Sequence, residues 1–194
     1  NPYNLNLQSG QRVIGEIKNF TPLEVDLTQI LGLHNEPGVD VLTILYQYNI
    51  KPGFSSDELR QARSFKQDIN VNEYPDRRDL TSDIIFTIDG EDTKDIDDAI
   101  SIDKVEGGYR LGVHIADVSH YVTENSAIDQ GASERGTSVY VVDRVVPMLP
   151  VELSNKLCSL NPHVNRLAMS VYIDLDEYGT IKNYEFFESI IQSK

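Results

Sequence analysis

The chain has 194 residues, of which 40% are hydrophobic and 25% are charged, and this composition is typical of a folded globular protein rather than a disordered or fibrous one. Its one cysteine, Cys158, cannot form an internal disulfide, which argues against a secreted, disulfide-stapled scaffold. No apolar run approaches the ~18 residues of a membrane span, and residues 1–4 lack the charged and apolar regions of a signal peptide. We therefore expect a cytoplasmic protein that does not enter a membrane.

The formal net charge of −14 at first argues against a nucleic-acid partner, because such partners are held largely by Lys and Arg side chains on phosphates. The charge is not evenly spread, however. Residues 81–106 hold nine acidic and two basic residues, which gives this segment half of the net negative charge. The rest of the chain repels a polyanion only mildly at physiological ionic strength. The acidic segment therefore needs a local explanation.

The chain begins with short expected β-strands, which are typical of the end of a small β-domain. A helix is expected after Pro37, which suits a first-turn position. Ser55 stands three residues before Glu58, and this capping-box pattern predicts a second helix over residues 56–67. The polar stretch at 68–80 reads as a connector into a new domain.

Beyond the connector, strands are expected at 84–88 and 99–102. The Gly107-Gly108 turn predicts an antiparallel hairpin between 99–102 and a strand at 109–116. The remaining expected elements are helices at 126–134 and 151–160 and strands at 139–142, 166–175 and 180–191. Because nothing follows the last strand, we expect an exposed edge that can recruit another chain, and the chain looks cut at both ends.

Six carboxylates lie within ten residues between two expected strands, and only Lys94 opposes them: Asp89, Glu91, Asp92, Asp95, Asp97 and Asp98. Mutual repulsion in a folded protein would raise several of their pKa values unless a cation intervenes. Oxygen donors without a nearby His or Cys favour Mg²⁺ or Mn²⁺, and such a cradle suits phosphoryl chemistry with one or two ions. An acidic loop is also often a plain solvated turn, and this one does not match an EF-hand calcium loop.

The segment from Thr87 to Ala99, TIDGEDTKDIDDA, resembles the signature of the ribonuclease II / ribonuclease R superfamily, the RNB catalytic domain. The resemblance continues through residues 111–122, 135–140 and 147–162 and is closer to the ribonuclease R branch. Upstream, residues 31–40 resemble the junction from a cold-shock (OB-fold) domain into the catalytic domain.

The resemblance implies an α+β fold in three parts: the C-terminal part of a small β-barrel cold-shock domain with its following helix at 1–50, a helical connector at 51–80, and the N-terminal part of a mixed α/β RNB catalytic domain at 81–194. It also implies a Mg²⁺-dependent 3′→5′ exoribonuclease that degrades RNA from a single-stranded 3′ end, processively, to nucleoside 5′-monophosphates. No membrane partner and no particular protein partner is implied. Family members are several times longer, so we expect this segment by itself to have little or no nuclease activity.

The resemblance assigns roles to five residues of this chain. The four signature aspartates are implied to hold the metal ion or to orient the attacking water, and they are Asp89, Asp95, Asp97 and Asp98. Among them Asp98 is implied to be the most critical for chemistry. Tyr140 is implied to clamp the terminal nucleotide by stacking on its base.

Two readings without catalysis stay open: a module that binds RNA without hydrolysing it, and a Ca²⁺-binding structural domain. Several weaker candidates are expected to be ordinary structural residues, namely His114, Asp117 and His120, and Cys158 is expected to be a packed thiol. Five arginines could meet phosphates, although isolated surface arginines usually meet water: Arg77, Arg78, Arg135, Arg144 and Arg166. The physiological RNA targets, the oligomeric state and the number of metal ions are left open by the sequence.

Overall fold

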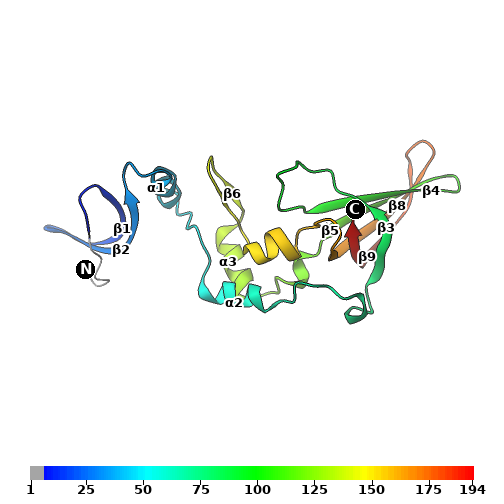
Figure 1. Cartoon of the computed structure of the whole chain (residues 1–194), viewed down its shortest axis with the longest axis horizontal. Coiled ribbons are helices and arrows are strands. Elements are labelled where there is room, and N and C mark those ends of the chain that lie inside the picture. The colour runs from blue at the N-terminus through cyan, green and yellow to red at the C-terminus, as the bar shows by residue number, and fades with distance from the viewer. Residues whose placement is uncertain (1–6) are drawn as a thin grey trace. The chain divides into compact units, whose positions relative to one another are not determined.

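The computed structural model describes residues 7–194, which divide into two compact units (Figure 1). The first unit runs to Gly53 and also includes Val139–Val146, and the second comprises Phe54–Ser138 and Pro147–Lys194. Within residues 7–194, no helix combines the length and the apolar character that crossing a bilayer requires.

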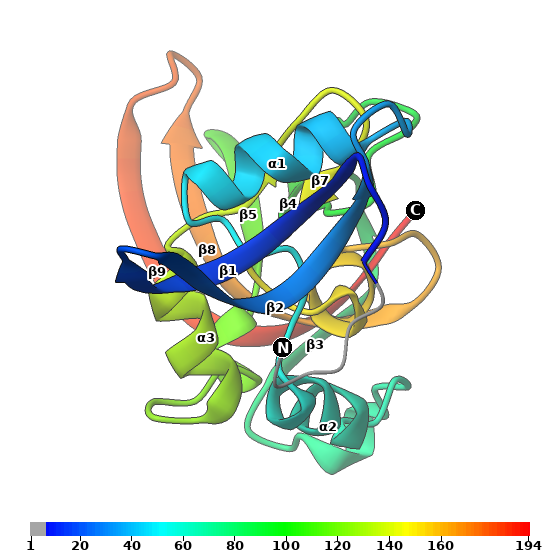
Figure 2. The same ribbon diagram turned by 90° about the vertical axis from the view of Figure 1, so that its left-hand side faces the viewer.

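The first unit is built on an antiparallel pair of strands, β1 (Gln11–Phe20) and β2 (Leu23–Leu33). Helix α1 (Val39–Gln47) lies along this pair, as Figure 2 shows. The helix expected after Pro37 is confirmed, but the first-turn position expected for Pro37 was wrong, because Pro37 precedes the N-cap. The helix begins at Val39, and Gly38 at its N-cap takes a left-handed φ of 83° that favours glycine.

A five-stranded sheet forms the larger part of the second unit, with the order β3-β9-β8-β5-β4. Its strands are β3 (Arg78–Ile85), β4 (Asp98–Val105), β5 (Gly108–Ala116), β8 (Asn165–Asp176) and β9 (Ile181–Ser193). Neighbouring strands are antiparallel except for β3 and β9, which are parallel. The expected hairpin of β4 and β5 is therefore confirmed, and the strands expected at 166–175 and 180–191 are present as β8 and β9.

Two sequence expectations about this sheet were wrong. The first strand begins at Arg78, not at residue 84, because polar residues such as Asp79 and Ser82 interrupt the apolar pattern in the first part of β3. The last strand is not an exposed edge, since β9 lies between β8 and β3 and pairs with both. β3 and β4 stand at the two ends of the strand order, and an antiparallel bridge joins Phe86, just after β3, to Ile100 of β4.

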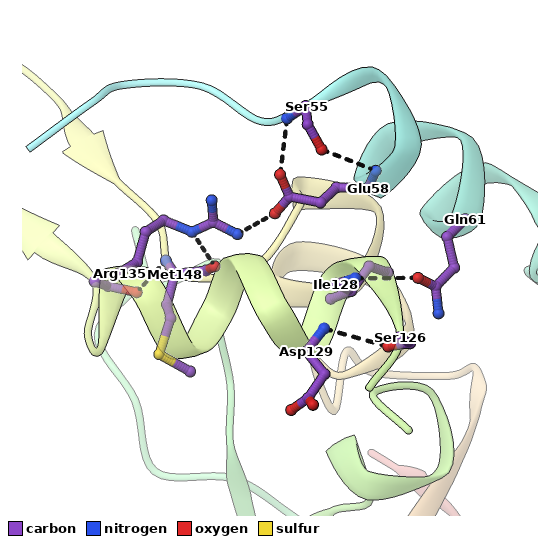
Figure 3. Close-up of polar contacts among 9 residues, drawn as sticks. Ser55, Glu58, Gln61, Ser126, Ile128, Asp129, Arg135 and Met148 are labelled. Carbon is purple, nitrogen blue, oxygen red and sulfur yellow. Dashed lines mark hydrogen bonds and ion pairs between the residues drawn. The ribbon is translucent and has the colours of Figure 1, made fainter. Parts of the chain in front are cut away.

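Two helices pack together in the second unit, α2 (Ser56–Ser64) and α3 (Ala127–Arg135). The predicted capping box is present, because Ser55 Oγ accepts the amide N–H of Glu58 and the Glu58 carboxylate accepts the amide N–H of Ser55. The same carboxylate forms an ion pair with Arg135 of α3, as Figure 3 shows. One carboxylate thus closes the first turn of α2 and links it to the end of α3.

The hydrophobic core of this unit combines one face of the sheet with its helices. A π-helical turn, Leu153–Leu157, falls inside the helix expected at 151–160 and contributes two fully buried leucines. The other large, fully buried apolar side chains of the core are Ile85, Ile128, Leu160, Leu167, Ile190 and Ile191. This core is the platform on which the loop between β3 and β4 rests.

Candidate functional site

The acidic segment found in the sequence forms the connection between strands β3 and β4. The chain leaves the sheet after Phe86, whose backbone pairs with that of Ile100 by hydrogen bonds of 3.0 and 2.9 Å. It returns at Asp98, the first residue of β4, which faces Ile115 of β5 in the register. The predicted placement of the acidic cluster in the loop between two strands is therefore confirmed.

The four signature aspartates differ in exposure. Asp89, Asp97 and Asp98 are exposed, and Asp95 is half-buried. The Ile96 side chain between two of them is buried in the core, with 9% of its surface exposed. The buried Ile96 side chain fixes this part of the loop on the protein, while the carboxylates of Asp97 and Asp98 after it are exposed to solvent.

The carboxylates interact electrostatically. Partial burial raises the pKa of Asp97, and the negative charges of Asp95, Asp98 and Asp89 raise it further. The four side chains therefore create one region of negative potential that a bound cation would relieve.

The chemistry of this donor set fits a hard divalent cation, because it offers carboxylate oxygens and no His or Cys. Within the part of the chain that the structure describes, no three His, Cys, Asp or Glu side chains are arranged as a ready-made metal site. Mg²⁺ commonly uses only one or two carboxylates and takes its other ligands from water and substrate phosphates. The aspartates can therefore supply one or two carboxylate ligands to such an ion, and they do not form a complete metal site from protein side chains alone.

Hydrogen bonds to the backbone of residues 94–97 hold the second half of the loop. The Ser159 hydroxyl accepts the N–H of Ile96 at 3.0 Å and donates to the C=O of Lys94 at 2.9 Å. The N–H of Leu160 donates to the C=O of Ile96 at 2.8 Å, and the N–H of Ala116 donates to the C=O of Asp97 at 2.9 Å. Sequence reasoning missed Ser159 as a site residue, because a serine 63 positions from Ile96 gives no local signal.

Tyr140 lies in the other compact unit. It forms the two-residue strand β6 (Val139–Tyr140), which pairs with β7 (Val145–Val146), and its side chain is 65% exposed. The expected longer strand at 139–142 is thus limited to two residues. An exposed aromatic ring on a short hairpin can stack on a nucleic-acid base.

The five arginines considered as phosphate ligands all have protein partners. Arg77 pairs with Asp117, Arg78 with Glu185, Arg135 with Glu58 and Arg144 with Asp143, while Arg166 donates to backbone carbonyls. The expectation that isolated arginines meet water was wrong for Arg77 and Arg166, whose side chains are inside the protein. His114 and Cys158 are buried, as expected, and burial raises the pKa of the Cys158 thiol to about 12.

Comparison with known families matches two parts of this chain. Residues 1–55 match the cold shock domain, and residues 77–194 match the RNB domain. These matches confirm the predicted α+β fold with a cold-shock part followed by part of an RNB domain. The structure adds that Val139–Val146, inside the RNB match, belongs to the same compact unit as the cold-shock part.

Curated relatives and a solved structure cover nearly all of the chain. It is 50% identical over 168 residues to Ribonuclease R 1 of Lactococcus lactis, covering 86% of this chain and 21% of that protein. It is 44% identical over 191 residues to Ribonuclease R of Thermotoga maritima, covering 95% of this chain and 27% of that protein. The structure of Mycoplasma genitalium RNase R in complex with ribose methylated single-stranded RNA matches all of this chain and 31% of its own, with 34% identity and a TM-score of 0.88. The chain spans about a quarter of the length of these relatives.

Proposed function

Since this chain belongs to the RNB domain family, we propose that the full-length protein that contains it is a 3′→5′ exoribonuclease. The observation that carries this proposal is the loop between β3 and β4, where Asp89, Asp95, Asp97 and Asp98 form one interacting set of carboxylates. Three of the four are exposed, so a substrate phosphate and a metal ion can reach them.

We propose Mg²⁺, with Mn²⁺ as a possible substitute, as the cofactor. Asp89, Asp95, Asp97 and Asp98 would supply its carboxylate ligands, and the bound ion would activate water and stabilise the leaving oxygen at the 3′-terminal phosphodiester. The chain's own part is to hold these carboxylates on a short loop that two strands and a core isoleucine fix. Asp98 is held within β4, where it pairs with Ile115 of β5.

The proposed substrate is RNA with a single-stranded 3′ end, which the enzyme shortens processively to nucleoside 5′-monophosphates. Support comes from the RNase R of Mycoplasma genitalium, whose solved complexes contain single-stranded and double-stranded RNA. Tyr140 would stack on the terminal base, and the exposed position of its ring allows this. The single free cysteine, Cys158, needs no oxidising compartment, and we place the proposed activity in the cytoplasm.

The test uses the full-length protein with an RNA that has a 3′ overhang, and with a circular RNA of the same sequence. We expect Mg²⁺ or Mn²⁺ to be required, nucleoside 5′-monophosphates to appear from the linear RNA, and the circular RNA to stay intact. Cleavage of the circular RNA would contradict the exonucleolytic part of the proposal. The segment of 194 residues alone is expected to release no mononucleotides at a comparable rate.

The alternative function is an RNA-binding module without catalysis. It predicts that the full-length protein binds the linear RNA and leaves it intact at every Mg²⁺ or Mn²⁺ concentration. The four clustered aspartates argue against it, because a protein that only binds a polyanion gains nothing from them.

A further inference from the structure

The hydroxyl of Ser159 forms hydrogen bonds with the backbone of the loop between β3 and β4. Its side chain is fully buried, and it makes two hydrogen bonds to the loop backbone, one to the C=O of Lys94 and one from the N–H of Ile96. These two groups belong to the peptide bonds on either side of Asp95. One hydroxyl therefore restrains the backbone before and after a single aspartate, and with it the direction of that side chain.

Ser159 is itself held from the other side. The Nε of Arg166 donates to the C=O of Ser159 at 3.0 Å, and Nη1 of the same side chain donates to the C=O of Asn165 at 2.8 Å. Arg166 is only 8% exposed. The following residue, Leu160, receives a hydrogen bond of 2.8 Å on its C=O from the hydroxyl of Ser193. Hydrogen bonds from Arg166 of β8 and Ser193 of β9 therefore hold the segment that contains Ser159.

This arrangement has a physical reason. Like charges on Asp89, Asp95, Asp97 and Asp98 repel one another and would push the loop apart without a bound cation. A buried hydroxyl cannot exchange its partners for water, so its two hydrogen bonds oppose this motion continuously. A site that must hold ligands to within about 0.5 Å depends on such supporting bonds.

We propose that Ser159, held by Arg166, is a positioning residue that keeps Asp95 in place for metal binding and catalysis. This inference rests on the proposed function for the role of Asp95. The anchoring of the loop itself does not rest on that function, so the two can be tested apart.

The test compares Ser159→Ala with Ser189→Ala in the full-length protein. Ser189 is the matched control, because it is also a fully buried serine of this unit, and its hydrogen bonds go to Ala168 and Ser170 of β8. Three quantities are measured: hydrogen exchange of the peptide that includes the Ile96 amide, the affinity for Mn²⁺ by electron paramagnetic resonance, and kcat and KM on linear RNA.

In Ser159→Ala we expect faster hydrogen exchange of the peptide that includes Ile96 and an affinity for Mn²⁺ about tenfold weaker than in the wild type. We also expect a lower kcat with an unchanged KM. None of these changes is expected in Ser189→Ala. Ser159→Cys retains the side-chain volume with a weaker hydrogen-bonding group, and it gives the same test if the alanine variant does not fold.

Unchanged exchange and Mn²⁺ affinity in Ser159→Ala would overturn the positioning role, as would equal changes in both alanine variants. If the wild-type protein binds Mn²⁺ and RNA but hydrolyses nothing, the proposed function fails. The exchange comparison would then still show whether Ser159 anchors the loop.

Discussion

Arg77 and Asp117 form an ion pair inside the second unit, with 6% and 4% of their side chains exposed. Asp117 follows strand β5 and also accepts hydrogen bonds from the Ser119 hydroxyl and the His120 N–H. The Nη1 of Arg77 is buried and has no hydrogen-bond partner. The pair ties the segment before β3 to the end of β5.

Removing Arg77 should therefore destabilise the protein strongly. Arg77→Ala leaves the Asp117 carboxylate buried without its cation, and breaking such a pair costs about 3–5 kcal/mol. Thermal unfolding of the full-length protein measures this loss. The control is Arg60→Ala, because Arg60 and Asp57 form an exposed pair, with 77% and 61% of their side chains in solvent, and should matter little. Equal effects of the two substitutions would contradict the importance of the buried pair.

The lowered pKa of Asp117 predicts how the free energy of unfolding changes at acidic pH. Burial acts to raise the pKa of Asp117, but hydrogen bonds from Ser119 and Arg77 outweigh it and hold this pKa below its ordinary value. The carboxylate therefore contributes stability above the unfolded-state pKa near 3.9, and this contribution is lost as the pH falls through the folded-state pKa. Asp117→Asn should flatten the fall in unfolding temperature below about pH 4.

The lowered pKa of His114 predicts a second pH dependence of stability, at a higher pH than that of Asp117. Burial lowers the pKa of His114 to about 4, and its ring bridges the hydroxyls of Ser101 and Ser170. Between pH 4 and about 6.5 the unfolded chain binds a proton that the folded protein does not. Stability should therefore fall as the pH drops through this window, by up to about 3 kcal/mol.

The measurement is the unfolding temperature of the wild-type protein and His114→Gln between pH 7 and pH 4. The variant is expected to be less stable at pH 7 but to lose less stability as the pH falls. Replacement of the exposed His34 by Gln is the control and should leave the pH dependence unchanged. A wild-type slope that survives in His114→Gln would contradict this assignment.

Gly131, in the middle of α3, should not tolerate a side chain. A Cβ at this position would meet the carboxylate of Glu58 and the guanidinium of Arg135, the ion pair shown in Figure 3. Alanine usually stabilises a helix by about 1 kcal/mol relative to glycine, but here the displaced ion pair should outweigh that gain. We expect Gly131→Ala to lower the unfolding temperature, and an increase would contradict this packing.

Local signals allowed the sequence to predict a good part of this structure. The Ser55 and Glu58 capping box, the Gly107-Gly108 hairpin and the acidic loop each lie within a few consecutive residues, and each is present where expected. The first part of β3, residues 78–83, escaped detection because polar residues such as Asp79 and Ser82 interrupt its apolar pattern.

Long-range contacts could not be read from the sequence. The bond between Ser159 and Ile96 joins residues 63 positions apart, and Arg77 and Asp117 are 40 positions apart. Neither pair belongs to a pattern that periodicity or spacing would reveal. The position of β9 between two strands likewise depends on β3, which lies about a hundred residues earlier. The aspartates were found because they are clustered, and the residue that holds their loop was missed because it is distant in sequence.

The central proposal is that Asp89, Asp95, Asp97 and Asp98 carry the hydrolysis of RNA in the full-length protein, and one pair of variants tests it most directly. Asp98→Asn and Asp103→Asn each remove one negative charge from an exposed position of β4, but only Asp98 lies beside the other carboxylates and contributes to the raised pKa of Asp97. The measurement is the rate of mononucleotide release from a 3′-overhang RNA by the full-length protein under saturating Mg²⁺. We predict that Asp98→Asn abolishes release while RNA affinity is retained, and that Asp103→Asn keeps the wild-type rate. Wild-type release by Asp98→Asn would contradict the claim.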